Sequence, residues 1–70
     1  LPFAEPIPVR TGVVATRTGP LRIRETPGGR VLALAPKGAP LTVYGQWEGW
    51  YVVHYGSVVG YAGAEFVILE

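Results

Sequence analysis

The stretch that decides the fold is GWYVVHY at residues 49–55, followed closely by GYAGAEFV at residues 60–67. Both runs are rich in aromatic and β-branched residues, which favour β-strands, and the short turn Gly56-Ser57 lies between them. Neither run has an arrangement of side chains that is typical of catalysis. A surface cluster of rings on a small β scaffold is typical of a module that binds a partner, so these residues predict a binding surface.

The chain has 70 residues and no Cys. A chain of this length buries about 60% of the surface that its unfolded form exposes, and it supports one small core. Because there is neither a disulfide nor a Cys-based metal site, stability must come from apolar packing and from a closed or nearly closed sheet. The sequence therefore predicts one all-β domain that needs no cofactor.

The net charge of +1 is too small to indicate, by itself, that nucleic acid or an anionic membrane surface is the partner. No run of about 18 apolar residues is present, so we expect no insertion into a membrane. The sequence begins at Leu1 rather than at Met, which fits either a processed mature protein or an excised piece of a longer one. Both alternatives stay open.

Residues 1–10 are predicted to form a separate arm, and residues 11–70 the folded domain. Pro2, Pro6 and Pro8 fix φ, remove backbone donors and favour an extended, polyproline-like path. Such an arm serves as a passive tether to a neighbouring domain. Alternatively, it lies back across an aromatic groove, since grooves of this kind bind preformed extended segments at a low entropy cost.

From residue 11 onward the pattern is that of short strands separated by turns. Strands are expected at residues 12–18, 21–24, 30–35, 41–44 and 50–55 and in the closing run, with turns at residues 26–29, 36–38, 47–49 and 56–57. No segment has the uninterrupted period of an amphipathic helix. Five or six strands with Gly or Pro between them predict a small barrel or sandwich.

Several short sequence words in this order resemble the bacterial SH3-like (SH3b) domain family. They are LRIR at residues 21–24, the Pro-Gly turn, VL at 31–32, KG at 37–38, LTV at 41–43, GWYVV at 49–53 and GYA at 60–62. The resemblance covers residues 13–69 and implies an SH3-like barrel. The closing run is also similar to the GYIPSNYV ending of eukaryotic SH3 domains, which implies a one-turn 3-10 helix before the last strand.

The resemblance also assigns the faces of the strands. If Tyr51 and Val53 point inward, with Ile23, Val43 and Val67, then Trp50 and Val52 point outward, because side chains alternate along a strand.

The position of Trp50 lines the ligand groove in the eukaryotic relatives, and the position of Phe66 offers a second ring. Tyr61 and Trp47 are further candidates because they are close in sequence. The alternative for Trp50 is a structural one, in which the ring closes one end of a thin barrel.

Two departures from the eukaryotic pattern bear on the ligand. The turn that is long and acidic in those domains is short here and carries only Glu25, and Gly63 stands where their groove has Pro. Both changes disfavour an Arg-bearing Pro-rich peptide. The resemblance to bacterial domains instead implies a secreted or envelope protein that binds cell-wall peptidoglycan or a peptide. A shallow groove of rings suits a glycine-rich or amino-sugar chain.

The inventory of side chains disfavours an enzyme. His54 and Ser57 are the one His and the one Ser, and there is no Asp to orient an imidazole. We expect His54 to be a solvated residue at the end of a strand, and no metal site, because no second soft ligand is present.

The sequence is compatible with two other functions. Arg22 and Arg24 share one face of a strand, and Arg10, Arg17 and Arg30 would extend it into a surface for single-stranded nucleic acid if the rings stacked on bases. A solvated strand face explains the alternating Arg equally well.

The second alternative is a protein-interaction, assembly or spacer module within a larger protein. An exposed Leu34 would enlarge an apolar patch beside Val31 or Ala33.

Overall fold

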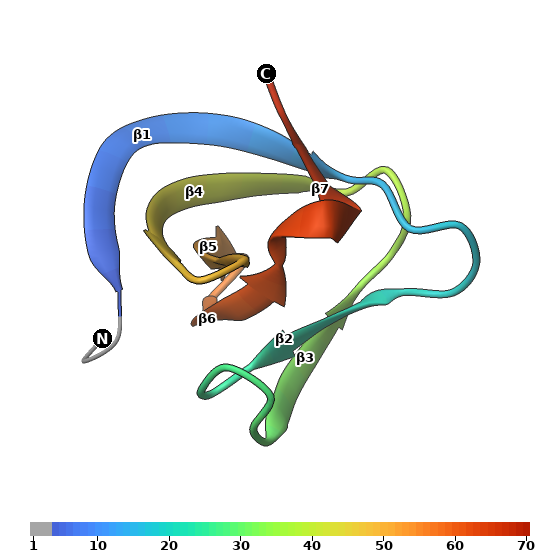
Figure 1. The fold of residues 1–70 in the computed structure, drawn as a ribbon. Helices are drawn as coiled ribbons and strands as arrows, with labels where there is room; N and C mark the ends of the chain where they lie inside the picture. The colour runs from blue at the N-terminus through green and yellow to red at the C-terminus, as the bar shows by residue number, and fades with distance from the viewer. Residues whose placement is uncertain (1–3) are drawn as a thin grey trace.

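Seven antiparallel strands form one sheet in the computed structural model, which describes residues 4–70. Hydrogen-bonded neighbours follow the order β3-β2-β6-β5-β4-β1-β7, and the sheet curls around a core (Figure 1). A 3-10 helix, η1, lies between β6 and β7. The elements are β1 (Glu5–Val14), β2 (Leu21–Arg24), β3 (Val31–Ala35), β4 (Pro40–Trp47), β5 (Trp50–Tyr55), β6 (Val58–Gly63), η1 (Ala64–Phe66) and β7 (Val67–Leu69).

This architecture confirms the prediction of an all-β, SH3-like barrel with a one-turn 3-10 helix near the C-terminus. The number of strands exceeds the expected five or six, because η1 divides the closing run into β6 and β7. The turns at residues 26–29 and 36–38 are closed by hydrogen bonds from Gly29 N to Thr26 O (2.9 Å) and from Ala39 N to Pro36 O (3.0 Å). Over residues 4–70, no helix is long and apolar enough to cross a membrane.

Strand β1 is longer at its start than the sequence predicted, and it ends earlier. It begins at Glu5 instead of residue 12 and ends at Val14 instead of residue 18. Glu5 pairs with Gln46 and Pro6 with Gly45, so the described part of the expected arm runs along β4 (Figure 1). The prolines are tolerated because β7 joins β1 only at residues 12–14, which leaves one side of residues 5–10 without a described strand neighbour.

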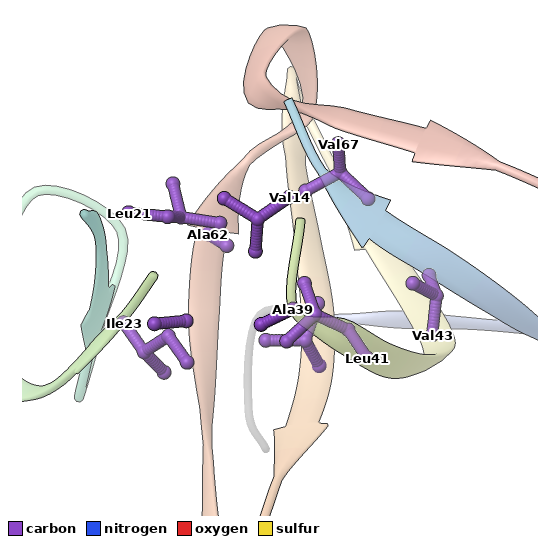
Figure 2. Close-up of a cluster of buried hydrophobic side chains, with 10 residues drawn as sticks. Val14, Leu21, Ile23, Ala39, Leu41, Val43, Ala62 and Val67 are labelled. Atoms are coloured by element: carbon purple, nitrogen blue, oxygen red, sulfur yellow. The ribbon is translucent and has the colours of Figure 1, made fainter. Parts of the chain in front are cut away.

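The core lies inside the curled sheet and is built from small and branched apolar side chains (Figure 2). Ile23, Val43 and Val53 are fully buried, and Val67 is buried with them, as the strand alternation predicted. Tyr51 packs against this cluster as a partly buried ring. The other buried members are Val14, Leu21, Ala35, Ala39, Leu41 and Ala62.

A second buried pair lies on the opposite face of the sheet, outside this cluster. Val52 and Tyr61 are paired between β5 and β6, and their exposed fractions are 1% and 0%. Val52 therefore points away from the core, as predicted, and it is buried on that face. The N-terminal segment explains part of this burial: a Cβ added at Gly45 would lie 3.0 Å from Val52 Cγ2 and 3.3 Å from Ala4 Cβ.

Candidate functional site

An open groove with a volume of about 800 Å³ lies on the outer face of the barrel. Four segments line it: the loop that follows β1, the outer face of β2, the start of β5, and the end of β6 with η1. Its lining residues are Ala15, Thr16, Arg17, Thr18, Pro20, Leu21, Arg22, Arg24, Gly49, Trp50, Gly63, Glu65 and Phe66.

The register of the sheet explains why the groove is hollow at this point. Trp50 pairs with Trp47 of β4 on one side and with Gly63 of β6 on the other. Paired residues in neighbouring strands point to the same face. Across the three strands, this face therefore carries the indole rings of Trp47 and Trp50 and then Gly63, which has no side chain. The groove is lined at this point by Gly63, and Trp50 forms the wall beside it.

Phe66 forms part of the same wall. A Cβ added at Gly63 would stand 3.1 Å from Phe66 Cδ2, so this ring packs over the face of Gly63 from which a side chain would project. Two backbone hydrogen bonds hold η1 in place: Ala64 N donates to Gly49 O (2.8 Å), and Ala15 N donates to Phe66 O (2.8 Å). The rings of Trp50 and Phe66 are thus attached to a hydrogen-bonded frame, and Phe66 stays 40% exposed.

The opposite wall is cationic. In β2, Leu21 and Ile23 are buried in the core, so Arg22 and Arg24 point outward by strand alternation. Arg24 pairs with Tyr61 of β6, and both arginines line the groove together with Trp50 and Gly63.

The guanidinium of Arg24 is half-buried, and its Nη1 donates to Gly29 O at 2.8 Å. Arg22 is exposed.

The loop at residues 15–20 supplies the third arginine. Thr16 is buried, and its Oγ1 donates to Gly19 O at 2.7 Å, which closes the loop on itself. Arg17 and Thr18 are exposed at the tip of this loop and line the groove. The groove thus contains three arginines and one glutamate, Glu65 of η1.

The five residues that the sequence proposed for ligand binding are not brought together. Trp50 and Phe66 line the groove, whereas Trp47 is half-buried on the β4 side of Trp50 and Glu25 lies in the β2–β3 loop, where its Oε2 is 3.3 Å from Arg30 Nη2. Tyr61, a further candidate, is fully buried, with an exposed fraction of 0%, and is not among the lining residues. Whether Trp50 and Phe66 bind a ligand stays a prediction.

Sequence reasoning did not assign the arginines to the same groove as the rings. The alternation of apolar and cationic residues in LRIR (residues 21–24) was the available signal, and it was interpreted as a nucleic-acid surface or as a solvated strand face. The structure separates these arginines from the others: Arg10 donates to Glu70 O at 2.9 Å, and Arg30 pairs with Glu25. Neither Arg10 nor Arg30 lines the groove, so the cationic surface there consists of Arg17, Arg22 and Arg24.

The other candidate residues lie apart from the groove. His54 and Ser57 are both exposed near the β5–β6 turn. Within residues 4–70, no group of three His, Cys, Asp or Glu side chains is placed to hold a metal ion. The described part of the arm, residues 4–10, contributes none of the lining residues, and residues 1–3 lie outside the described part of the chain.

The comparison with protein families agrees with the barrel and its pattern of strands. Residues 19–68, more than two thirds of the chain, match the family described as Bacterial SH3 domain. Comparisons with curated proteins and with solved structures gave no match. The family match begins in the loop before β2 and ends in β7, so it includes both walls of the groove, and the chain belongs to the bacterial SH3 domain family.

Proposed function

We propose that this domain is a non-catalytic binding module that attaches its parent protein to cell-wall peptidoglycan through the groove of Trp50 and Phe66. Bacterial SH3 domains are often binding modules. The observation that carries the proposal is the pair of rings in the groove: Trp50 is half-buried and paired with Gly63, and the ring of Phe66 packs against the same glycine. This arrangement offers an apolar wall of two rings.

The shape of the groove favours an extended chain of small units as the ligand. Aromatic faces pack well against the CH faces of amino sugars and against peptide planes. Short peptides and amino sugars are the two components of peptidoglycan. A peptide or protein partner of the same extended form would use the same contacts.

The chemistry of the lining residues supports a binding role over catalysis. Glu65 is the one carboxylate among them, whereas glycoside hydrolysis ordinarily requires a pair of carboxyl groups. The hydroxyl of Thr16 is engaged with Gly19 O. A secreted or envelope location of the parent protein follows from this proposal, because peptidoglycan lies outside the cytoplasm.

A second candidate function, assembly within a larger protein, is favoured by the surface of β3. This strand is an edge of the sheet, and Val31, Leu32 and Leu34 on it are 39%, 37% and 54% exposed. An apolar edge strand offers both backbone groups and side chains to another chain. The assembly hypothesis therefore places the partner at β3 and not at the groove.

Co-sedimentation with purified, protein-free peptidoglycan tests the proposed function. We expect the wild type to be retained and Trp50→Ala to lose about tenfold or more in apparent affinity, as for a central aromatic contact. Phe66→Ala is the second groove variant and Leu34→Ala the matched control, because Leu34 is an exposed apolar side chain outside the groove. Circular dichroism verifies that each variant is folded. Equal retention of all four proteins, or retention of none, would overturn the proposal.

A further inference from the structure

We propose that the groove recognises a free carboxylate on a peptide, which binds at the arginine wall while the neighbouring part of the peptide packs on the Trp50 ring. This inference rests on the proposed function and deepens it by naming the charged group of the ligand. Four observations carry it: two arginines without a partner in the described structure, the anchoring of the third, the presence of Arg22 and Trp50 in one groove, and the charge balance of that groove.

Arg17 and Arg22 are the arginines available for a ligand. In the described part of the chain, each of the other three arginines donates a hydrogen bond: Arg10 to Glu70 O, Arg24 to Gly29 O and Arg30 to Glu25 Oε2. Arg17 and Arg22 have no such partner there, and both line the groove. Their guanidinium groups therefore keep all of their donors for a bound anion.

Arg24 adds a cation whose position is already fixed. Its Nη1 is engaged with Gly29 O, and a guanidinium has five N–H donors, so donors remain for a ligand. The side chain is half-buried, which reduces screening by solvent compared with a fully exposed charge. A side chain held in this way loses less conformational entropy when it binds an anion.

The arrangement of the two walls defines the form of the ligand. Arg22 of β2 and Trp50 of β5 line the same groove, and Trp50 pairs with Gly63. A single ligand segment in this groove therefore contacts a cation with one edge and an indole ring with the other. A peptide that carries a carboxylate on a short side chain or at its C-terminus meets both walls, and the planar guanidinium pairs with the two carboxylate oxygens.

The charge balance favours a peptide carboxylate over nucleic acid. Three arginines face one glutamate in the groove, while the whole chain carries only +1. Binding of a phosphate backbone relies on several cations along an extended path, and Arg10 and Arg30 are engaged elsewhere. The groove can neutralise one or two negative charges, which matches a short acidic peptide.

The test compares native peptidoglycan with peptidoglycan whose carboxyl groups have been converted to amides. We expect wild-type retention to fall by about fivefold on the amidated polymer, which corresponds to an exposed charge-assisted contact. Arg22→Gln should lower retention on the native polymer to a similar extent and should be insensitive to amidation. Glu65→Gln should raise retention on the native polymer, because it removes the one opposing charge in the groove. Lys37→Gln, at an exposed cation outside the groove, should change neither value.

The outcomes separate this inference from the function on which it rests. Equal wild-type retention on both polymers would overturn carboxylate recognition and leave peptidoglycan binding standing. Retention on neither polymer would overturn both proposals. A single-stranded oligonucleotide that displaces the domain from native peptidoglycan, with a strong dependence on salt, would show that the arginines prefer phosphate and would overturn the assignment to a carboxylate.

Discussion

Gly60 of β6 lies against the backbone of Arg24 in β2, and a Cβ added at position 60 would stand 2.6 Å from the Arg24 carbonyl oxygen and 2.8 Å from Ile23 Cγ2. These two strands share one paired position, Arg24 with Tyr61, within the described residues. The contact at Gly60 therefore sets how closely the β2–β3 hairpin approaches β6, and with it the place of the arginine wall relative to Trp50.

Gly60→Ala is expected to lower the free energy of unfolding by about 2 kcal/mol, because backbone atoms and a fully buried Ile23 leave no room for the methyl group. Urea unfolding followed by tryptophan fluorescence measures this change. Gly56→Ala is the control: its Cβ meets nothing within 4 Å, so only its positive φ of 60° is unfavourable, at about 1 kcal/mol. If Gly60→Ala lowered the free energy of unfolding no more than Gly56→Ala does, β2 and β6 would be able to move apart without a cost in stability.

Tyr61→Phe is expected to leave the protein as stable as the wild type or to stabilise it by about 1 kcal/mol. The ring is fully buried, and its hydroxyl has no hydrogen-bond partner in the described structure, so removing the oxygen removes an unsatisfied polar group. Thermal unfolding of the two proteins gives the comparison. A clear destabilisation by Tyr61→Phe would contradict this account and would mean that the hydroxyl is hydrogen-bonded within the fold.

The position of η1 was implied by the resemblance to eukaryotic SH3 domains, whereas local patterns in the sequence were sufficient to predict the turns and the alternation of β2. Each of these patterns depends on residues that are close in sequence: Thr26 to Gly29 form one turn, and Leu21 to Arg24 alternate over four positions. The resemblance assigned Val53 to the core, and the parity of the strand then placed Trp50 and Val52 on the other face.

Contacts between distant segments account for what the sequence could not predict. Tyr61 and Val52 occupy the outer face by parity, yet they are buried, and one cause is the pairing of residues 5 and 6 with β4, about 40 positions away. Pro6 and Pro8 are typical of an extended linker, and only the free side of β1 makes them compatible with a strand. The alternation of LRIR indicated that Arg22 and Arg24 share one face, but not that they line a groove with Trp50, because Arg17, Arg22 and Trp50 meet only through the sheet order.

Glu48→Asn is expected to raise the free energy of unfolding by about 0.5 to 1 kcal/mol. Glu48 and Gly49 form the two-residue turn between Trp47 and Trp50, and both have positive φ, 40° and 85°. Such a turn favours Asn at its first position, whereas Glu is strained there. Glu48→Ala serves as the control, because Ala removes the charge without relieving the strain. Equal stability of the Asn and Ala variants would show that the gain does not come from the backbone.

Leu34→Lys separates the two proposed functions, because it changes β3 and leaves the groove intact. Leu34 is 54% exposed at the open edge of the sheet, so we expect its replacement to alter the free energy of unfolding by no more than about 0.5 kcal/mol. The adjacent Ala35 is fully buried, and Ala35→Lys should prevent folding, which provides the contrast within one strand.

Sedimentation at several protein concentrations, with wild type and Leu34→Lys side by side, measures association. If β3 serves assembly between copies of this domain, the wild type associates and Leu34→Lys remains a monomer, because a Lys on an edge strand opposes pairing with another strand. Co-sedimentation with peptidoglycan should be the same for both proteins. A wild type that is monomeric at every concentration would remove self-assembly as a function of β3, and a loss of peptidoglycan binding by Leu34→Lys would place the wall contact at β3 instead of at Trp50.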